Sequence, residues 1–152
     1  MNTTTASSIE KFFSSSAFAV IGVSADRKKF GNIVYRAMKK RTVVAYPVHP
    51  RLPMVEGDRC FSSVAELPEK VKALVTVVPP TATEAVVAEC VRRKINTLWM
   101  QPGSESDLAI AEAEANGITV IQGQCILMFL EPVTSAHAVH RWFSKIVGTY
   151  PR

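Results

Sequence analysis

The sequence predicts a single α/β domain of three layers, in which helices cover a mostly parallel sheet of five to six strands. Short apolar runs alternate with amphipathic segments along the 152 residues, and such alternation is typical of a parallel sheet with right-handed crossovers. A hydrophobic fraction of 47% is sufficient for one core, whereas the length is short for two. We expect one domain over residues 1–152, with its core at about 14–130.

Five apolar segments have the composition of strands. They are short, continuous and rich in Val and Ile, as strands covered on both faces usually are. They comprise residues 18–21, 43–46, 73–78, 97–100 and 118–121.

Amphipathic segments between these runs predict helices at residues 32–40, 82–93 and 105–115, and a C-terminal helix is expected at about 134–147. Three S/T-x-x-E patterns predict capped helix N-termini. They are Ser7 with Glu10, Ser63 with Glu66, and Thr81 with Glu84.

The composition limits the classes of partner. A net charge of +5, from 18 Lys and Arg against 13 Asp and Glu, favours an anionic ligand. The cations are scattered and no nucleic-acid-binding motif accompanies them, so we expect no nucleic acid partner. Three widely spaced cysteines indicate neither a disulfide framework nor a zinc site. No apolar run approaches the length of a membrane span, so no membrane partner is expected.

The N-terminal segment KFFSSSAFAVIGVSA imitates a signal peptide, because a lysine precedes its apolar run. Cleavage there would remove the first expected strand and its glycine turn. We therefore expect this segment to belong to the fold and the protein to be cytoplasmic, which agrees with the cysteine usage.

The turn after the first expected strand is the most informative segment for function. Gly22 allows a sharp bend, Ser24 offers a hydroxyl, and Gly31 opens a helix whose free amides attract an anion. A pyrophosphate would suit this place, although the two glycines are nine positions apart, unlike those of a G-x-G-x-x-G fingerprint. The alternative is a glycine turn that serves packing alone.

The end of the second expected strand narrows the choice of ligand. A nicotinamide dinucleotide site usually has an acidic residue about 20 positions after the first glycine, where it binds the ribose diol. Residues 42–51 contain none, and His49 and Arg51 lie there instead. This favours a ribose that carries its own phosphate, as in coenzyme A or NADP. Arg27, Lys28 and Lys29 would add positive charge, although a solvated surface is the alternative for each cation alone.

Five ordered motifs lie along the chain. They are FAVIGVSADRKKFGNIVYRAMKKR, VVAYPVHP, SSVAELPEKVKALVTVVPP, LWMQPGSESDLAIAEAEANGITVI and GQCI, and they span roughly residues 14–130. Together they resemble the stand-alone coenzyme A-binding domain proteins, which are similar to the N-terminal domain of the succinyl-coenzyme A synthetase alpha subunit. The resemblance implies a Rossmann-type sheet with the ADP half of coenzyme A across its strand ends.

Carried over by position, the resemblance also implies roles for single residues. Gly22 and Ser24 would approach the phosphates, while Phe30 and Gly31 would shape their loop. The adenosine and its 3′-phosphate would border Val48, Pro50 and Arg51. The adenine or the pantetheine arm would face Val78, Pro79 and Pro80. The far side of the site would be lined by Gln101, Pro102 and Gly103.

The chain departs from the family at two points. His49 stands where many relatives have asparagine, which leaves the polar contact from that position open. The synthetase's phosphorylated histidine belongs to a second domain outside the resemblance, so synthetase activity is not implied.

Few residues offer chemistry of their own. Cys125 follows the last expected strand and would attack a thioester if cations lowered its pKa; an inert cysteine is the alternative. His137 and His140 lie three apart without further ligands, so we expect no metal. No nucleophile and carboxylate accompany His49 in a triad.

These observations predict a protein that binds coenzyme A or acyl-coenzyme A and has no evident catalytic machinery. It would serve as a sensor, a carrier or a subunit, and a homo-oligomer or a protein partner is left open. The alternatives are an enzyme that uses NADP or Cys125, and an interaction module that has lost its ligand.

Overall fold

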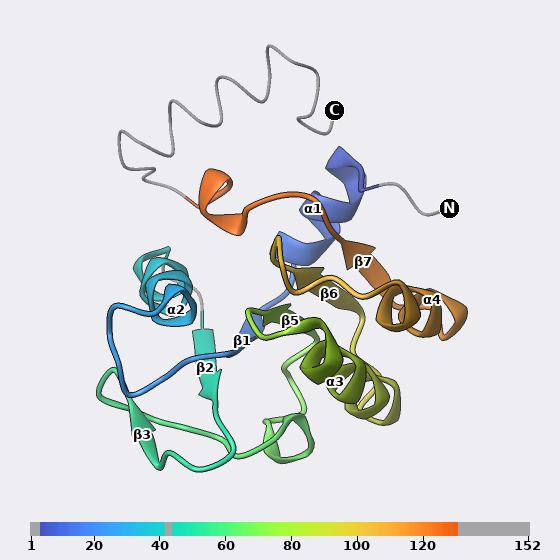
Figure 1. Cartoon of the computed structure of the whole chain (residues 1–152). Helices are drawn as coiled ribbons and strands as arrows, with labels where there is room; N and C mark the ends of the chain where they lie inside the picture. The colour runs from blue at the N-terminus through green and yellow to red at the C-terminus, as the bar shows by residue number, and fades with distance from the viewer. Residues whose placement is uncertain (1–3, 42–43, 131–152) are drawn as a thin grey trace.

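The structure is a computed structural model that describes residues 4–41 and 44–130. In this part of the chain, four helices cover a five-stranded sheet (Figure 1). The strands are β1 (Ala17–Ile21), β2 (Val44–Val48), β5 (Ala73–Thr76), β6 (Thr97–Met100) and β7 (Thr119–Ile121). The helices are α1 (Ala6–Phe13), α2 (Phe30–Lys40), α3 (Pro80–Arg92) and α4 (Asp107–Ala115). The 3-10 turns are η1 (Val64–Glu66) and η2 (Ile126–Met128).

All five strands are parallel, in the order β2-β1-β5-β6-β7. The chain moves from β1 to β2 on one side and returns to β5 on the other, so the strand order reverses between β1 and β5. Parallel α/β sheets bind ligands outside the carboxyl ends of the strands at such a reversal. The predicted three-layer α/β fold is confirmed, and it places the expected ligand crevice at the ends of β1, β2 and β5.

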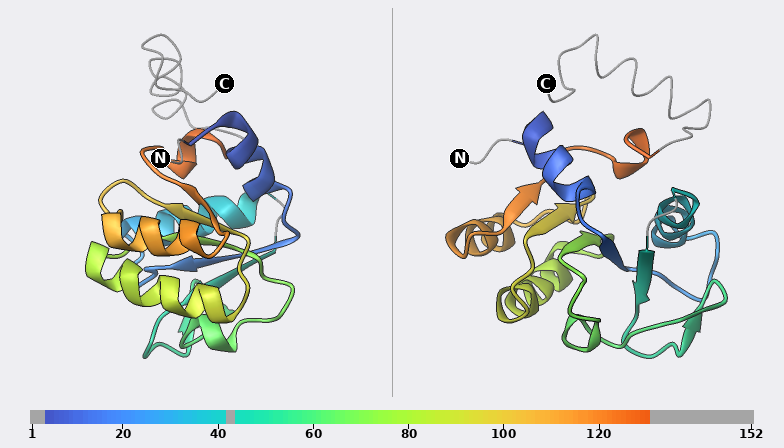
Figure 2. Two further views of the ribbon diagram at one scale, coloured as in Figure 1. Left: turned by 90° about the vertical axis from the view of Figure 1, so that its right-hand side faces the viewer. Right: turned by 180° about the vertical axis from the view of Figure 1, so that it is seen from behind.

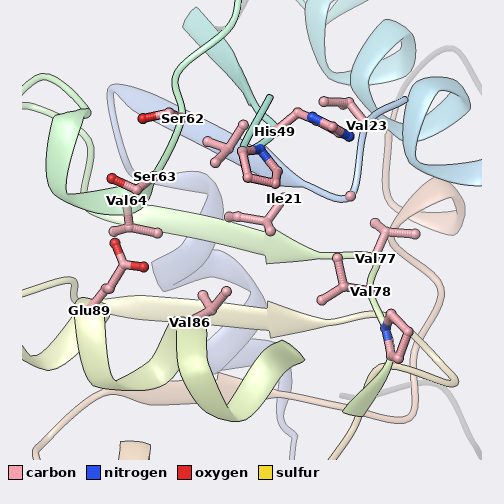
Figure 3. Close-up of a pocket in the computed structure, with 14 residues that line it drawn as sticks. Ile21, Val23, His49, Ser62, Ser63, Val64, Val77, Val78, Val86 and Glu89 are labelled. Carbon is pink, nitrogen blue, oxygen red and sulfur yellow. The ribbon is translucent and has the colours of Figure 1, made fainter. Parts of the chain in front are cut away.

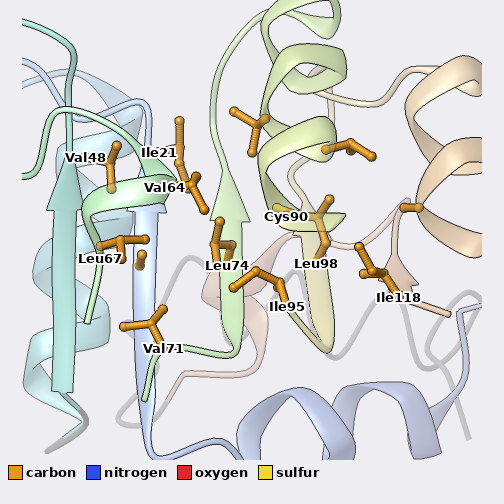
Figure 4. Packing of buried hydrophobic residues seen from close by; sticks show 14 of the residues in the cluster. Ile21, Val48, Val64, Leu67, Val71, Leu74, Cys90, Ile95, Leu98 and Ile118 are labelled. Atoms are coloured by element: carbon orange, nitrogen blue, oxygen red, sulfur yellow. The ribbon is translucent and has the colours of Figure 1, made fainter. Parts of the chain in front are cut away.

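The two faces of the sheet carry separate apolar clusters, because successive side chains of a strand point to opposite faces. Phe18 and Val20 of β1 belong to the cluster formed with α1 and α2. Ala19 and Ile21 belong to the cluster formed with α3, α4 and η1 (Figure 4). Two views in Figure 2 show α3 and α4 side by side on one face of the sheet.

The edge strand β2 is longer than expected, because it continues through Pro47 to Val48. The carbonyl of Pro47 accepts a hydrogen bond from Phe61 N (2.9 Å) on the side of β2 away from β1. The missing N–H of Pro47 therefore falls outside the β1–β2 ladder, where proline is tolerated. A separate two-stranded pair that the sequence did not predict, β3 (Met54–Val55) with β4 (Asp58–Arg59), follows this strand.

The expected helix caps were wrong in detail. Thr5, rather than Ser7, caps α1 by accepting a hydrogen bond from Ser8 N. α3 begins at Pro80, which suits the first helical position because its φ is fixed and it lacks an N–H. Thr81 therefore lies inside the first turn, and Ser63 precedes η1 without a side-chain cap. The helix expected at 134–147, with His137 and His140, lies outside the described residues.

Candidate functional site

A cavity of about 420 Å³ opens where the strand order reverses, between the ends of β1 and β2, the loop after β5, η1 and α3 (Figure 3). Its walls are mainly valine and isoleucine side chains. Six residues expected at the site from the sequence line it: Gly22, Val48, His49, Pro50, Val78 and Pro79. Eight further residues complete the lining: Ile21, Val23, Ser62, Ser63, Val64, Val77, Val86 and Glu89.

Gly22 brings three backbone segments together at one edge of this cavity. Its φ is +117°, and a Cβ added there would lie 2.1 Å from the carbonyl oxygen of Val77. A Cβ on Gly31 would lie 2.1 Å from the carbonyl oxygen of Gly22. Only glycine fits at either position, because the obstacle is backbone in both cases. Gly31 thus allows close packing of helix on strand, the role of the third glycine in a dinucleotide fingerprint.

The start of α2, beside this turn, is electrostatically unsatisfied. Lys29 occupies the N-cap position without a side-chain hydrogen bond, and the first turn contains no acidic residue. Among the described residues, the amides of Phe30 and Gly31 have no hydrogen-bond acceptor. The positive end of a helix dipole is destabilised by cations and stabilised by anions, yet Lys28 and Lys29 lie here. An anionic ligand would resolve this conflict.

Asn32 fixes the loop between β1 and α2. It is fully buried, and its side chain brackets the backbone of Ser24: Oδ1 accepts from Ser24 N (2.8 Å), and Nδ2 donates to Ser24 O (2.8 Å). The Ser24 hydroxyl accepts a hydrogen bond from Asp26 N (3.1 Å). The loop is therefore shaped before any ligand arrives.

Glu56, at the turn between β3 and β4, ties the same loop to the rest of the protein. Its side chain is 5% exposed, and it accepts hydrogen bonds from Asn32 Nδ2 (3.1 Å), Arg36 Nη1 (2.7 Å) and Arg27 Nε (3.0 Å). Burial alone would raise the pKa of Glu56, but these hydrogen bonds outweigh it and hold the pKa below its usual value. Arg27 is thus paired, whereas Lys28 and Lys29 are exposed and make no ion pair among the described residues.

His49 shapes the turn that follows β2. Its Nδ1 accepts hydrogen bonds from Arg51 N (3.0 Å) and Leu52 N (3.2 Å). A ring nitrogen that accepts cannot carry the proton, so the neutral ring is protonated at Nε2. Arg51 is exposed beside the cavity-lining Pro50 but does not itself line the cavity.

The loop after β6, expected to line the far side of the site, lies outside the cavity lining. Gln101 is 2% exposed and braces the loop after β7, because its Oε1 accepts from Ile126 N (2.7 Å) and its Nε2 donates to Cys125 Sγ (3.5 Å). Pro102 and Gly103 follow it at the surface. Cys125, a candidate nucleophile, is half-buried beside Gln101 and does not line the cavity either.

The remaining expected residues do not line the cavity. They are Ser24, Arg27, Lys28, Lys29, Phe30 and Gly31 in the β1–α2 connection, and Pro80 at the start of α3. Sequence reasoning did not identify Ser62, Ser63, Val64, Val86 and Glu89. Ser62 and Ser63 precede η1, Val64 begins it, and Val86 and Glu89 belong to α3. No local pattern places them beside β1.

The described residues hold no group of three or more His, Cys, Asp or Glu side chains that could bind a metal ion. Burial raises the pKa of Cys90 to about 12, which removes its thiol as a nucleophile. Within residues 4–41 and 44–130, every helix is too short or too polar to cross a bilayer.

Comparison with protein families gives a match to the model described as "CoA binding domain", over residues 16–131. The ADP-forming acetate–CoA ligase I of Archaeoglobus fulgidus is 26% identical over 148 residues, covering 91% of this chain and 21% of the ligase. The alpha subunit of the ADP-forming acetate–CoA ligase II of Pyrococcus furiosus is 35% identical over 83 residues, covering 54% of this chain and 18% of the subunit. The chain thus spans about a fifth of the length of these relatives.

Solved structures share the fold. A conserved hypothetical protein from Pyrococcus furiosus has a TM-score of 0.69 and 35% identity, over 72% of this chain and 95% of that protein. A hypothetical protein from Pyrococcus horikoshii has a TM-score of 0.78 and 23% identity, over 84% and 89% of the two chains. The dinucleotide-forming acetyl-coenzyme A synthetase 1 of Ca. Korarchaeum cryptofilum, solved with phosphate and ADP, has a TM-score of 0.63 and 25% identity, over 70% of this chain and 25% of the synthetase.

Proposed function

The chain belongs to the CoA-binding domain family, and on this basis we propose that its cavity binds coenzyme A or acyl-coenzyme A. The family match bears out the resemblance that the sequence motifs indicated. The observation that carries the proposal for this chain is the unsatisfied start of α2, where free amides and two unpaired lysines lie beside the Gly22 turn.

The diphosphate would lie at the amides of Phe30 and Gly31, with Lys28 and Lys29 beside it. Backbone amides at a helix N-terminus supply hydrogen bonds and positive potential without a change in the fold. The adenosine would then enter the apolar cavity past Val48 and Pro50. Its 3′-phosphate would lie outside the cavity near Arg51, which is exposed and available for a charge-assisted hydrogen bond.

The pantetheine arm would leave in the other direction, over Val78 and Pro79. In this arrangement it would pass the start of α3 at Pro80 and the loop that holds Gln101, Pro102 and Gly103. The protein would act as a sensor, a carrier or a subunit of a larger assembly.

Ligand-dependent thermal unfolding tests the proposal. A ligand that binds the folded state raises the unfolding midpoint, so coenzyme A and acetyl-coenzyme A should raise it and NADPH should not. Mass spectrometry of the purified protein checks independently for a retained ligand. A shift with NADPH alone would favour the NADP-dependent alternative, and no shift with any of the three would refute binding.

Arg51→Ala tests the position of the 3′-phosphate. The substitution should weaken binding of coenzyme A by about 1.5 to 3 kcal/mol, the value of a hydrogen bond to a charged group, and should affect dephospho-coenzyme A much less. Titration calorimetry with both ligands measures the difference. Arg92→Ala is the matched control, because Arg92 is an exposed arginine at the far end of α3 that does not line the cavity. Equal losses for the two ligands would contradict the assignment.

A further inference from the structure

One carboxylate in the cavity has no role in binding phosphate. Glu89 projects from α3 into the end of the cavity formed by Ser63 and Val64, away from the loop at Val77 and Val78 (Figure 3). It is half-buried and makes no ion pair among the described residues. A negative charge at this end repels phosphate groups, so the uncharged part of an anionic ligand must face it.

The hydrogen bonds of Glu89 leave one oxygen available. Oε2 accepts a hydrogen bond from Ala65 N (3.0 Å), which fixes the carboxylate against η1. Within the described part of the chain, Oε1 makes no hydrogen bond. The carboxylate of a half-buried residue loses part of its hydration when a ligand fills the cavity, and a ligand that donates a hydrogen bond to it restores that loss.

Among the polar groups at this end of the cavity, Glu89 is the one that distinguishes a ligand group that donates a hydrogen bond from one that accepts it. The hydroxyls of Ser62 and Ser63 can donate or accept, so they fit either kind of ligand group. A carboxylate only accepts. The walls beside it include the apolar side chains of Val64 and Val86 (Figure 3), which suit a flat, weakly hydrated ring. This end of the cavity therefore fits an aromatic base that presents a hydrogen-bond donor at its edge.

We propose that Glu89 is the specificity-determining residue for the base, and that its Oε1 accepts a hydrogen bond from the exocyclic amine of adenine. This inference rests on the proposed binding of coenzyme A. Adenine presents an amine at this edge, whereas hypoxanthine presents a carbonyl oxygen in its place, which the Glu89 carboxylate repels.

The test compares coenzyme A with its deaminated analogue, in which hypoxanthine replaces adenine. Calorimetric titration of the wild-type protein should show binding of coenzyme A at least about tenfold tighter than binding of the analogue, as expected for one charge-assisted hydrogen bond. In Glu89→Gln, the amide oxygen can keep the contact with Ala65 N while the amide NH2 donates to the hypoxanthine carbonyl. The preference should therefore fall to about one or reverse.

Glu84→Gln is the matched control. Glu84 lies on the same helix and accepts a hydrogen bond from Ser106 Oγ (2.6 Å), but it does not line the cavity. This variant should keep the wild-type preference. Because the readout is a ratio of two affinities for one folded protein, a moderate loss of stability in either variant does not change it.

Two results would overturn the inference. A wild-type protein that binds coenzyme A and the analogue equally well has no contact with the amine. A Glu89→Gln variant that keeps the preference, with or without an equal loss of affinity for both ligands, leaves Glu89 as a residue that only supports η1 or meets the pantetheine arm. In these cases the proposed function stands, whereas a wild-type protein that binds neither ligand refutes the proposed function as well.

Discussion

The helices α2 and α4 each follow a strand of the same parallel sheet, yet they begin in opposite ways. At the start of α4, Ser106 Oγ accepts a hydrogen bond from Ala109 N (3.3 Å), and Asp107 places an acidic residue in the first turn. At the start of α2, Lys29 provides no cap and the first turn contains no acid. In both helices the first two amides have no acceptor among the described residues, and both dipoles are positive at this end. Only α4 adds a side-chain cap and an acidic residue to its first turn.

The turns before the two helices also differ, in how closely each glycine is packed. Gly22 and Gly103 both have positive φ values, +117° and +93°. Gly22 is packed against the backbone of Val77, whereas nothing lies within 4 Å of a Cβ placed on Gly103. The connection before α2 is thus tightly packed and leads to a helix without a cap or an acidic first turn, while the connection before α4 is less constrained and leads to a helix that has both. This combination is what a pre-organised ligand site requires.

The largest difference in unfolding free energy is expected between Gly22→Ala and Gly103→Ala. Alanine at either position meets the cost of a positive φ, about 1 to 3 kcal/mol. Gly22→Ala must in addition displace the Val77 carbonyl, and overpacking of this kind costs about 1 to 3 kcal/mol more. Urea unfolding should show a loss of roughly 2 to 6 kcal/mol for Gly22→Ala and about 1 to 3 kcal/mol for Gly103→Ala. Equal losses would mean that the Gly22 turn is not closely packed.

A smaller loss of stability is expected when the carboxylate that holds the loop before α2 is replaced. Glu56→Gln keeps the shape of the side chain but removes the charge that faces Arg27 and Arg36. We therefore expect the unfolding free energy to fall by about 2 kcal/mol at pH 7. The corresponding contact before α4 is made by the Ser104 hydroxyl, which bridges Thr76 and Thr83. This hydroxyl is neutral, so its contribution to stability does not depend on pH.

The pH dependence of this effect has a definite sign. The pKa of Glu56 is lower in the folded protein than its usual value of 4.5, so the unfolded chain takes up the proton first as the pH falls. The contribution of Glu56 is therefore complete above about pH 4.5 and is lost as the pH falls through the folded pKa. The difference in unfolding free energy between the wild type and Glu56→Gln should shrink on acidification. A difference independent of pH would contradict the charged role of Glu56.

The fold could be predicted from the sequence because its signals are local. The apolar runs that became β1 and β6 are continuous, and the glycine that ends β1 is required by a single close contact with Val77. The bounds of two elements differ from the prediction because each contains a proline. Pro47 lies within β2 because that strand is at the edge, and Pro80 starts α3 earlier than the Thr81 pattern predicts.

The candidate site was only partly predictable, for a physical reason. Residues directly after strands, such as Gly22 and His49, could be predicted to lie together because parallel strands end at one edge of the sheet, and both line the cavity. Glu56 comes from a hairpin turn and Glu89 from the last turn of α3, and each makes a contact with a residue more than 20 positions away. The Glu56-Gly57 pair has the form of a hairpin turn, but its partners Arg27, Asn32 and Arg36 follow from tertiary packing alone.

The smallest change in stability should carry the most information about the site. In Lys29→Asp, the new carboxylate would lie at an N-cap position whose backbone is already extended, with φ −64° and ψ 147°. It should cap α2 and satisfy the helix dipole, so thermal unfolding should show a gain of about 1 kcal/mol. The same carboxylate would compete with the diphosphate for the amides of α2, so the affinity for coenzyme A should fall at least about tenfold.

Ser106→Ala is the mirror experiment at α4, because it removes a cap that already exists. It should lose about 1 kcal/mol of stability and leave the affinity for coenzyme A unchanged. Lys29→Asn separates capping from charge, since asparagine caps a helix equally well without repelling phosphate; it should gain stability and lose less affinity than Lys29→Asp. If Lys29→Asp were stabilised and still bound coenzyme A as the wild type does, the diphosphate would not lie at α2, and the difference between the two helices would reflect folding alone.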